Sequence, residues 1–187
     1  AEHPGALLIG AHLGSFEVLR AVGRGQQGLK VAMMMYEDNA RKINATLEAI
    51  NPAATQDIIP LGRMDSMLQA RDKLDEGYLV GMLADRGLGD DATVDCDFLG
   101  KPAPFPLGPF RMAAMLRRPV FFMTGLYLGG NRYQLHFEPI ADFSQTTREE
   151  RDTAIHAAMQ HYADRLTHYC RLAPYNWFNF FDFWQKK

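Results

Sequence analysis

Short apolar runs alternate with segments of helical spacing along the first half of the chain, and this alternation constrains the fold more than any other feature. Because strands joined through helices of about a dozen residues need crossover connections, the alternation predicts an α/β fold. We expect a single domain with a mostly parallel central sheet flanked by helices. The runs that predict buried strands are residues 5–10, 29–36, 56–62 and 78–85.

The second half of the chain predicts a different set of elements. A helix is expected over 107–118, and the runs 119–128 and 132–140 predict two strands paired antiparallel across a Gly-Gly-Asn turn. Apolar residues recur at spacings of three and four within 147–171, which predicts a long helix. The segment 86–106 is rich in Gly, Pro and Asp, so we expect an irregular loop there that belongs to the active site.

Composition fits one compact domain spanning residues 1–187, with 47% hydrophobic and 22% charged residues. The formal net charge is -2, which gives no basic surplus for a nucleic-acid partner. Cys96 and Cys170 lie far apart without a CxxC neighbour, so we expect no zinc site, no disulfide framework and a reducing compartment. No apolar run is long enough to predict a spanning helix or a signal peptide. The chain begins at Ala1 directly before a strand, so we expect further residues upstream in a longer protein.

A histidine follows the first predicted strand, at the sheet edge where α/β folds carry their chemistry. In GAHLGSFEV, His12 and Glu17 would lie about 140° apart on a continuous helix and could not pair. If the chain turns at Gly14 and Ser15 caps the helix, the Glu17 carboxylate falls in the first helical turn and can reach the imidazole. A carboxylate on one ring nitrogen makes the other more basic, so His12 could take a proton from a hydroxyl group. The alternative is that His12 only caps the turn and Glu17 is a solvated helix residue.

The stretch HLGSFE resembles the His-x4-Glu form of the His-x4-Asp/Glu motif of the lysophospholipid acyltransferase superfamily. It is most similar to the bacterial lipid A late acyltransferases, the lauroyl and myristoyl acyltransferases. Residues 79–87 resemble that family's strand with an Asp, residues 94–123 its FxG, small-residue helix and proline-led strand, and residues 133–140 its closing strand. The C-terminal YNWFNFFDFW looks more like the predicted acyltransferases of bacterial aryl-polyene and related lipid clusters. An FPEGTR-like phosphate-binding block is absent, and DRG stands where lipid A enzymes often have DQ.

The resemblance implies a fold like that of glycerol-3-phosphate acyltransferase and the transfer of a fatty acyl group from an acyl thioester to a hydroxyl of a lipid or glycolipid. The thioester would be carried by acyl carrier protein or coenzyme A. His12 would be the general base and Glu17 its orienting partner, with no metal and no cofactor besides the acyl thioester. The resemblance also implies work at the cytoplasmic face of the bacterial inner membrane, with a hydrophobic anchoring segment expected upstream.

Charged residues at the ends of the other predicted strands would lie at the same sheet edge as His12. Asp85 and Arg86 end the fourth strand, and Arg41 follows the second. We expect these three residues to bind substrate because of this position. The guanidinium group of either arginine can hold a phosphate of the acceptor or of the pantetheine arm of the donor. Asp85 also matches the Asp of the active-site block in the resembling family. Lys42 beside Arg41, and Arg63 after the third strand, are rivals for the same role, and an ordinary exposed helix charge is the alternative for each.

An acyl chain needs a long apolar slot, and the aromatic and methionine residues of 98–122 could line it or form an ordinary core. The aromatic residues of 177–184 either pack across the domain, which we favour, or lie at a lipid headgroup boundary. Two other functions stay open. The same base could activate water in a hydrolase, or the His12 site could be structural in a domain that only binds a lipid or a partner.

Overall fold

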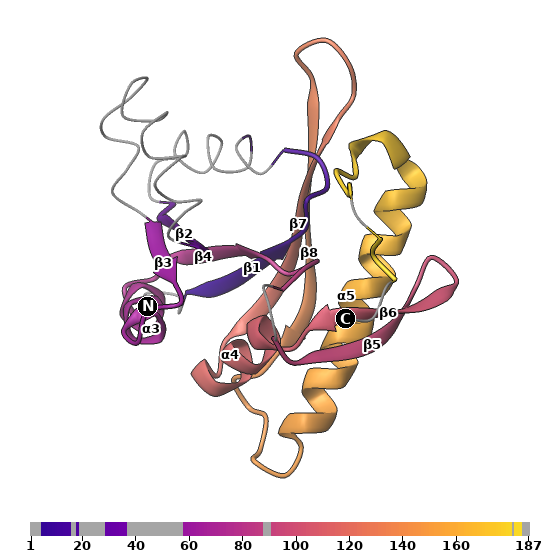
Figure 1. The fold of residues 1–187 in the computed structure, drawn as a ribbon. Helices are drawn as coiled ribbons and strands as arrows, with labels where there is room; N and C mark the ends of the chain where they lie inside the picture. Colours follow the sequence, from indigo (N-terminus) through magenta and orange to yellow (C-terminus); the bar gives the residue numbers. More distant parts are fainter. Residues whose placement is uncertain are drawn as a thin grey trace.

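A computed structural model describes residues 5–15, 18, 29–36, 58–87, 91–180 and 182–184. Within them, six strands form one sheet in the order β3-β2-β4-β1-β7-β8 (Figure 1). All neighbouring strands are parallel except β8, which runs antiparallel to β7. The expectation of a single α/β domain with a mostly parallel sheet is therefore confirmed. The strands are β1 (Ala6–Gly10), β2 (Val31–Tyr36), β3 (Ile58–Leu61), β4 (Leu79–Leu83), β7 (Pro119–Tyr127) and β8 (Tyr133–Asp142).

β1 lies inside the sheet, between β4 and β7, and every residue of its ALLIG sequence is buried. A strand covered on both faces has no polar side to alternate with its apolar side, which explains the continuous apolar run. Because β1 is central, the residues that follow it emerge at the middle of one sheet edge.

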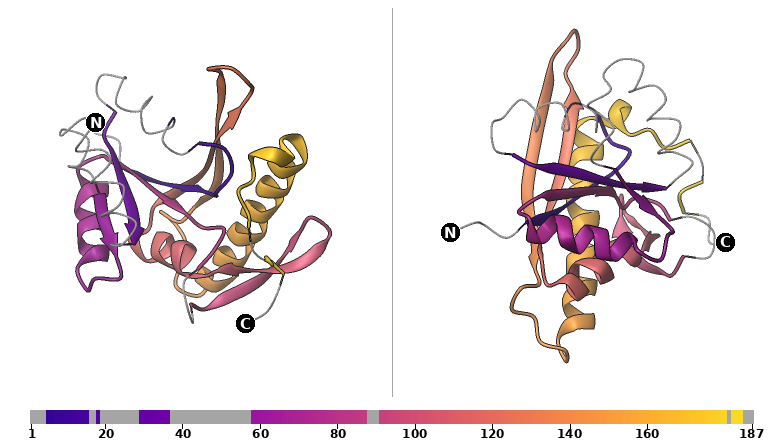
Figure 2. Two further views of the ribbon diagram at one scale, coloured as in Figure 1. Left: turned by 45° about the horizontal axis from the view of Figure 1, so that its top comes forward. Right: turned by 90° about the vertical axis from the view of Figure 1, so that its left-hand side faces the viewer.

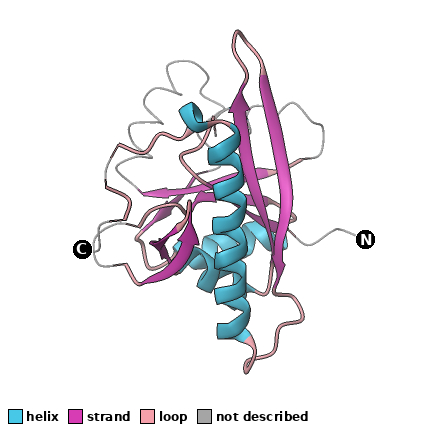
Figure 3. Cartoon of the chain, turned by 90° about the vertical axis from the view of Figure 1, so that its right-hand side faces the viewer, coloured by secondary structure: helices cyan, strands magenta, loops and turns pink. Residues whose placement is uncertain are grey.

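The helices of the described residues are α3 (Ser66–Asp75), α4 (Gly108–Leu116), α5 (Arg151–Leu172) and the short 3₁₀ turn η2 (Pro174–Asn176). The expected long helix is confirmed as α5, which lies against β8 and crosses the sheet (Figure 3). Its apolar stripe faces the core, and Met159, Tyr162 and Leu166 have no exposed surface. The helices expected after β1 and after β2 lie outside the described residues, except for Ser15 and Val18. No described helix combines the length and the apolar composition that crossing a bilayer requires.

The expectation of an irregular loop over 86–106 is wrong for its second part. There β5 (Thr93–Phe98) and β6 (Lys101–Pro106) form a separate two-stranded antiparallel sheet. Proline occupies every second position of β6, opposite Asp97, Asp95 and Thr93. Alternate N–H groups of a ribbon edge point away from the partner strand, so these prolines remove no ladder bond.

Side-chain alternation in β5 and β6 places one face of this small sheet against the core. Cys96 and Phe98 of β5 and Ala103 and Phe105 of β6 are buried, whereas Asp95 is exposed. The ring of Phe98 contacts Phe105 and three rings of the C-terminal segment, which are those of Trp177, Phe183 and Trp184. The packing interpretation of these three tail residues is confirmed.

Figure 2 shows the β7–β8 hairpin standing out beyond the rest of the sheet in both views. The nine residues of β7 and the ten residues of β8 are longer than the other strands of the sheet. The antiparallel pair expected across the Gly-Gly-Asn turn is confirmed, with Tyr127 opposite Tyr133 at its outer end.

We predict that Phe98→Ala lowers the free energy of unfolding by about 3–5 kcal/mol, because it leaves a cavity at the junction of β5, β6 and the C-terminal segment. Urea unfolding followed by circular dichroism measures the change. Phe137→Ala on β8 is the matched control, since that side chain is 50% exposed. Its effect is expected to stay under about 1 kcal/mol. Equal losses in the two variants would contradict the packing role of Phe98.

Candidate active site

His12 and Asp85 are brought together by the register of two neighbouring parallel strands. β1 and β4 pair with Gly10 opposite Leu83, and the Ala84 N–H donates to the Gly10 carbonyl at 3.0 Å. His12 and Asp85 are each two residues beyond that pair, so they lie side by side past the C-terminal ends of β1 and β4. The sequence expectation that they share one sheet edge agrees with this placement.

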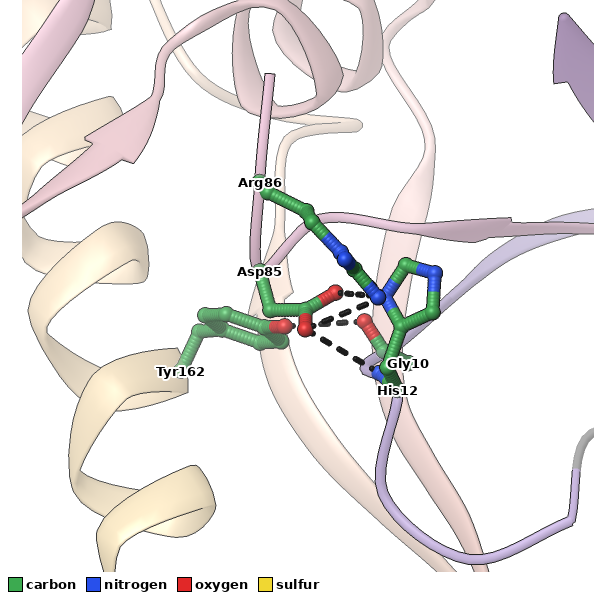
Figure 4. Close-up of polar contacts among 5 residues, drawn as sticks. All are labelled: Gly10, His12, Asp85, Arg86 and Tyr162. Atoms are coloured by element: carbon green, nitrogen blue, oxygen red, sulfur yellow. Dashed lines mark hydrogen bonds and ion pairs between the residues drawn. The ribbon is translucent and has the colours of Figure 1, made fainter. Parts of the chain in front are cut away.

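The His12 imidazole and the Asp85 carboxylate are in direct contact (Figure 4). Nδ1 of His12 lies 2.8 Å from Oδ1 and 3.1 Å from Oδ2 of Asp85. The backbone N–H of His12 also donates to Oδ2, at 3.1 Å. The carboxylate therefore fixes both the backbone and the ring of the same residue. The Asp85 side chain is 3% exposed and that of His12 is 35% exposed, so the imidazole is the member of the pair that faces solvent.

The interior side of Asp85 is closed by groups that keep their protons. Burial raises the pKa of the Tyr162 hydroxyl well above its usual value, and the charge of Asp85 raises it further. That hydroxyl donates to the Gly10 carbonyl at 2.8 Å (Figure 4). Burial, together with the Asp85 charge, also raises the pKa of the Cys170 thiol to about 12. Both groups therefore keep their protons at neutral pH, and neither acts as a base at this site.

Arg86 extends to the same ring atom, with Nε 3.0 Å from Nδ1 of His12. Nδ1 carries either one hydrogen or one lone pair, so it cannot donate to Asp85 and accept from Arg86 at the same time. A buried carboxylate needs hydrogen-bond donors, which favours the tautomer with hydrogen on Nδ1. In that tautomer Nε2 keeps a free lone pair.

The loop after β1 is held on one side by β7. The Thr124 hydroxyl, which is buried, donates to the Leu13 carbonyl at 2.9 Å. The Ser15 N–H donates to the Gly125 carbonyl at 2.8 Å, and Gly14 forms a parallel bridge with Gly125. Ser15 Oγ also accepts the Val18 N–H at 3.3 Å, which is the contact expected of a helix N-cap.

The C-terminal segment holds the same loop from the other side. The Gly14 N–H donates to the Asn176 carbonyl, and the Phe178 N–H donates to the His12 carbonyl, both at 2.8 Å. The Asn176 side chain in turn accepts the Tyr127 N–H at 2.7 Å. His12 is thus fixed by backbone bonds to segments that are more than a hundred residues away in sequence.

A family model described as bacterial lipid A biosynthesis acyltransferase matches residues 1–186. The chain belongs to this family. The resemblance stated from the sequence is thereby confirmed, and the chain is an O-acyltransferase with a role on lipid. No curated protein matches the chain at a significant level.

The remaining expectations for the acyltransferase site differ in outcome. Glu17 and Arg41 lie outside the described residues, so their expected roles stay predictions. Among the residues expected for an acyl slot, Phe98, Phe105 and Phe122 have no exposed surface and pack in the core. Within the described part of the chain, no cluster of His, Cys, Asp or Glu side chains could hold a metal ion.

Sequence reasoning missed Thr124, Tyr162 and Asn176 as supports of the acyltransferase site. Tyr162 belongs to the apolar stripe predicted within 147–171, and such a stripe predicts burial but does not reveal that the hydroxyl bonds to Gly10. Asn176 carries one weak signal, since it is a polar residue inside an aromatic stretch. The direct His12–Asp85 contact follows only when the strand register is known.

Gly14 is required both by backbone conformation and by close packing. Its φ is +72°, and a Cβ atom there would collide with the carbonyl of Gly125. We predict that Gly14→Ala lowers the stability of the acyltransferase more than Gly62→Ala does. Gly62 has a φ of +86° but no atom near the Cβ position, so it supplies the strain without the collision.

Thermal unfolding of the two glycine variants measures this difference. Gly62→Ala should cost about 1–2 kcal/mol of left-handed strain, and Gly14→Ala should exceed it and reduce turnover as the His12 loop shifts. Equal melting temperatures for the two variants would show that the Gly125 carbonyl moves aside without loss of stability, and would contradict the prediction.

Proposed function

We propose that this acyltransferase moves a fatty acyl group from an acyl thioester to a hydroxyl group of a lipid or glycolipid, with His12 as general base. The single observation that carries this proposal is the His12–Asp85 pair, a partly exposed imidazole whose Nδ1 is held by a buried carboxylate. Such a pair is what proton removal from a hydroxyl group requires. Family membership supplies the acyl chemistry.

In the proposed reaction, Nε2 of His12 takes the proton of the acceptor hydroxyl while the hydroxyl oxygen attacks the carbonyl carbon of the thioester. A carbon–oxygen bond forms and the carbon–sulfur bond then breaks. The departing thiolate takes the proton from the imidazolium and leaves as a free thiol. The negative charge of Asp85 stabilises the transient imidazolium, because the two groups touch and the carboxylate is buried.

Asp85 acts in this proposal as the positioning residue of His12 and not, as the sequence suggested, by contacting substrate. Both of its oxygens already contact His12 and almost none of its surface is exposed. Arg86 is partly exposed beside the imidazole and is proposed to bind a phosphate of the donor or the acceptor. Arg41 is proposed for the same task. Glu17 is proposed as an orienting partner of His12, in addition to Asp85. The donor is proposed to be acyl carrier protein or coenzyme A thioester, used at the cytoplasmic face of a bacterial inner membrane.

We predict that His12→Ala abolishes formation of an acylated lipid while the protein stays folded. The assay incubates the protein with acyl carrier protein or coenzyme A thioesters and a bacterial lipid extract, and detects products by mass spectrometry. His156→Ala is the matched control, because that histidine is exposed on α5. It should retain full activity.

Release of free fatty acid in place of an acylated lipid, dependent on His12, would replace the transferase by a hydrolase. An unchanged product in His12→Ala would remove His12 from the chemistry. No His12-dependent change in any donor, with both proteins folded, would leave a lipid-binding domain as the better interpretation.

We predict that Asp85→Asn lowers kcat roughly a thousandfold or more, because an amide can donate to Nδ1 and stabilise the wrong imidazole tautomer. Nitrogen NMR of the His12 ring reports which ring atom carries hydrogen and separates this effect from loss of structure. Asp152→Asn on the exposed side of α5 is the matched control. A large fall in kcat with the tautomer unchanged would contradict the positioning role.

A further inference from the structure

The strands β2 and β4 are paired over only the first part of their length, and their unpaired ends lie at the sheet edge that carries His12. The ladder between them ends at Met33 opposite Gly81. Beyond that pair, β2 stays bonded to β3 as far as Tyr36 opposite Leu61, and β4 stays bonded to β1. Substrates of open α/β sheets bind outside the carboxyl ends of the strands. The ends of β2 and β4 are therefore a place for the part of a substrate that extends away from the general base.

A side-chain contact joins the chain at these two strand ends. The hydroxyl of Tyr36, the last residue of β2, donates to Oδ2 of Asp91, in the segment after β4, at 3.4 Å. Burial and the charge of Asp91 raise the pKa of this hydroxyl, so it keeps its proton at neutral pH. The bond is longer than most O–H···O bonds, and such contacts often tighten only when substrate is bound. The Tyr36–Asp91 pair is thus a neutral hydroxyl beside a carboxylate at the sheet edge.

Gly87 allows the Asp91 carboxylate to lie against the chain after β4. A Cβ atom at Gly87 would be 2.8 Å from Oδ2 and 3.0 Å from Cβ of Asp91, so a side chain there would displace the carboxylate. Gly87 directly follows Arg86, whose Nε is 3.0 Å from Nδ1 of His12 (Figure 4). Two adjacent residues of one segment therefore connect the Tyr36–Asp91 pair to the general base.

The chemistry of the Tyr36–Asp91 pair suits one class of ligand. A carboxylate only accepts hydrogen bonds and has room for about four, whereas a tyrosine hydroxyl can accept one bond while it donates another. Asp91 is exposed and Tyr36 is partly exposed, so a ligand can reach both. The hydroxyl groups of a sugar or polyol can donate to each of them. A phosphate group is negatively charged at neutral pH, and a carboxylate repels it.

We propose that Tyr36 and Asp91 determine headgroup specificity by binding hydroxyl groups of the acceptor and excluding a phosphate from that position. This part of the acceptor is then an uncharged, hydroxyl-bearing headgroup. The inference rests on the proposed function, since it names the substrate class of that same site. The phosphate that Arg86 is proposed to hold then belongs to the donor.

Binding of two matched ligands to the unaltered chain tests this specificity. The ligands are dodecyl glucoside and the same glucoside phosphorylated on its primary hydroxyl, both titrated as monomers in a calorimeter. The chain should bind the glucoside at least about tenfold more tightly than its phosphate. Asp91→Asn should weaken binding of the glucoside about tenfold and bring the two affinities within about threefold of each other. Asp95→Asn, an exposed carboxylate of β5, is the matched control and should change neither affinity.

Two further variants test the other parts of the site. Tyr36→Phe removes only the hydroxyl and should weaken binding of the glucoside about fivefold. Tyr133→Phe is its matched control, because that ring is 41% exposed on β8. Gly87→Ala pushes the Asp91 carboxylate aside and should weaken glucoside binding as much as Asp91→Asn does.

Steady-state kinetics show which substrate the Tyr36–Asp91 pair binds. With dodecyl glucoside as acceptor and an acyl coenzyme A as donor, Asp91→Asn should raise KM for the glucoside about tenfold and leave KM for the donor unchanged. A raised KM for the donor alone would assign the pair to the amide groups of the pantetheine arm and overturn the proposal. Equal binding of the glucoside and its phosphate by the unaltered chain, equal loss of both in Asp91→Asn, or no binding of either would also overturn it.

His12→Ala separates this proposal from the proposed function. That variant should bind dodecyl glucoside as the unaltered chain does and form no acylated product. Normal glucoside binding by Asp91→Asn, together with His12-dependent acylation of a lipid extract, would overturn the headgroup assignment and leave the transferase intact. Asp91-dependent glucoside binding without any His12-dependent acyl transfer would support the headgroup site and overturn the role of His12.

Discussion

The site of this protein depends on the parallel pairing of β1 with β4. That pairing sets Gly10 opposite Leu83, and the two chains leave the sheet together. The backbone N–H and the imidazole of His12 then meet one buried carboxylate, that of Asp85. A shift of one residue in this register would turn the alternate side chains of β1 to the opposite face of the sheet. The burial of β1 on both faces and the chemistry of its C-terminal end are therefore fixed by the same ladder of backbone bonds.

Much of this arrangement could be predicted from the sequence because it follows from local patterns. Continuous apolar runs indicated the central strands, and parallel strands place their carboxyl ends at one edge, so His12, Asp85 and Arg86 were expected together. The apolar stripe of α5 could also be predicted, because the spacing of its residues depends on one helix alone. The β5–β6 sheet was missed because proline is usually read as a sign of irregular chain. Its prolines are compatible with a ribbon only through their alternation, which puts each one where no ladder bond is needed.

Other features could not be predicted because they are set by contacts between distant segments. The bonds from Thr124 to Leu13 and from Phe178 to His12 join residues that share no sequence pattern. Family membership gives the class of reaction. It does not tell which residues form the hydrogen bonds that hold the His12 loop. The orientation of the imidazole is a case in point, since its Nδ1 contacts both a carboxylate and a guanidinium and only burial of the carboxylate decides between them.

The C-terminal segment shows how one stretch of chain meets two physical requirements. Trp177 packs against the buried ring of Phe98, while its neighbour Phe178 is 47% exposed and bonds through its backbone to His12. Successive side chains of an extended segment point to opposite sides, so neighbouring aromatic residues have different surroundings. Hydropathy is similar for both residues and cannot separate them. Because Trp177 anchors the segment to the core, the backbone of Phe178 is held in place for its hydrogen bond to His12.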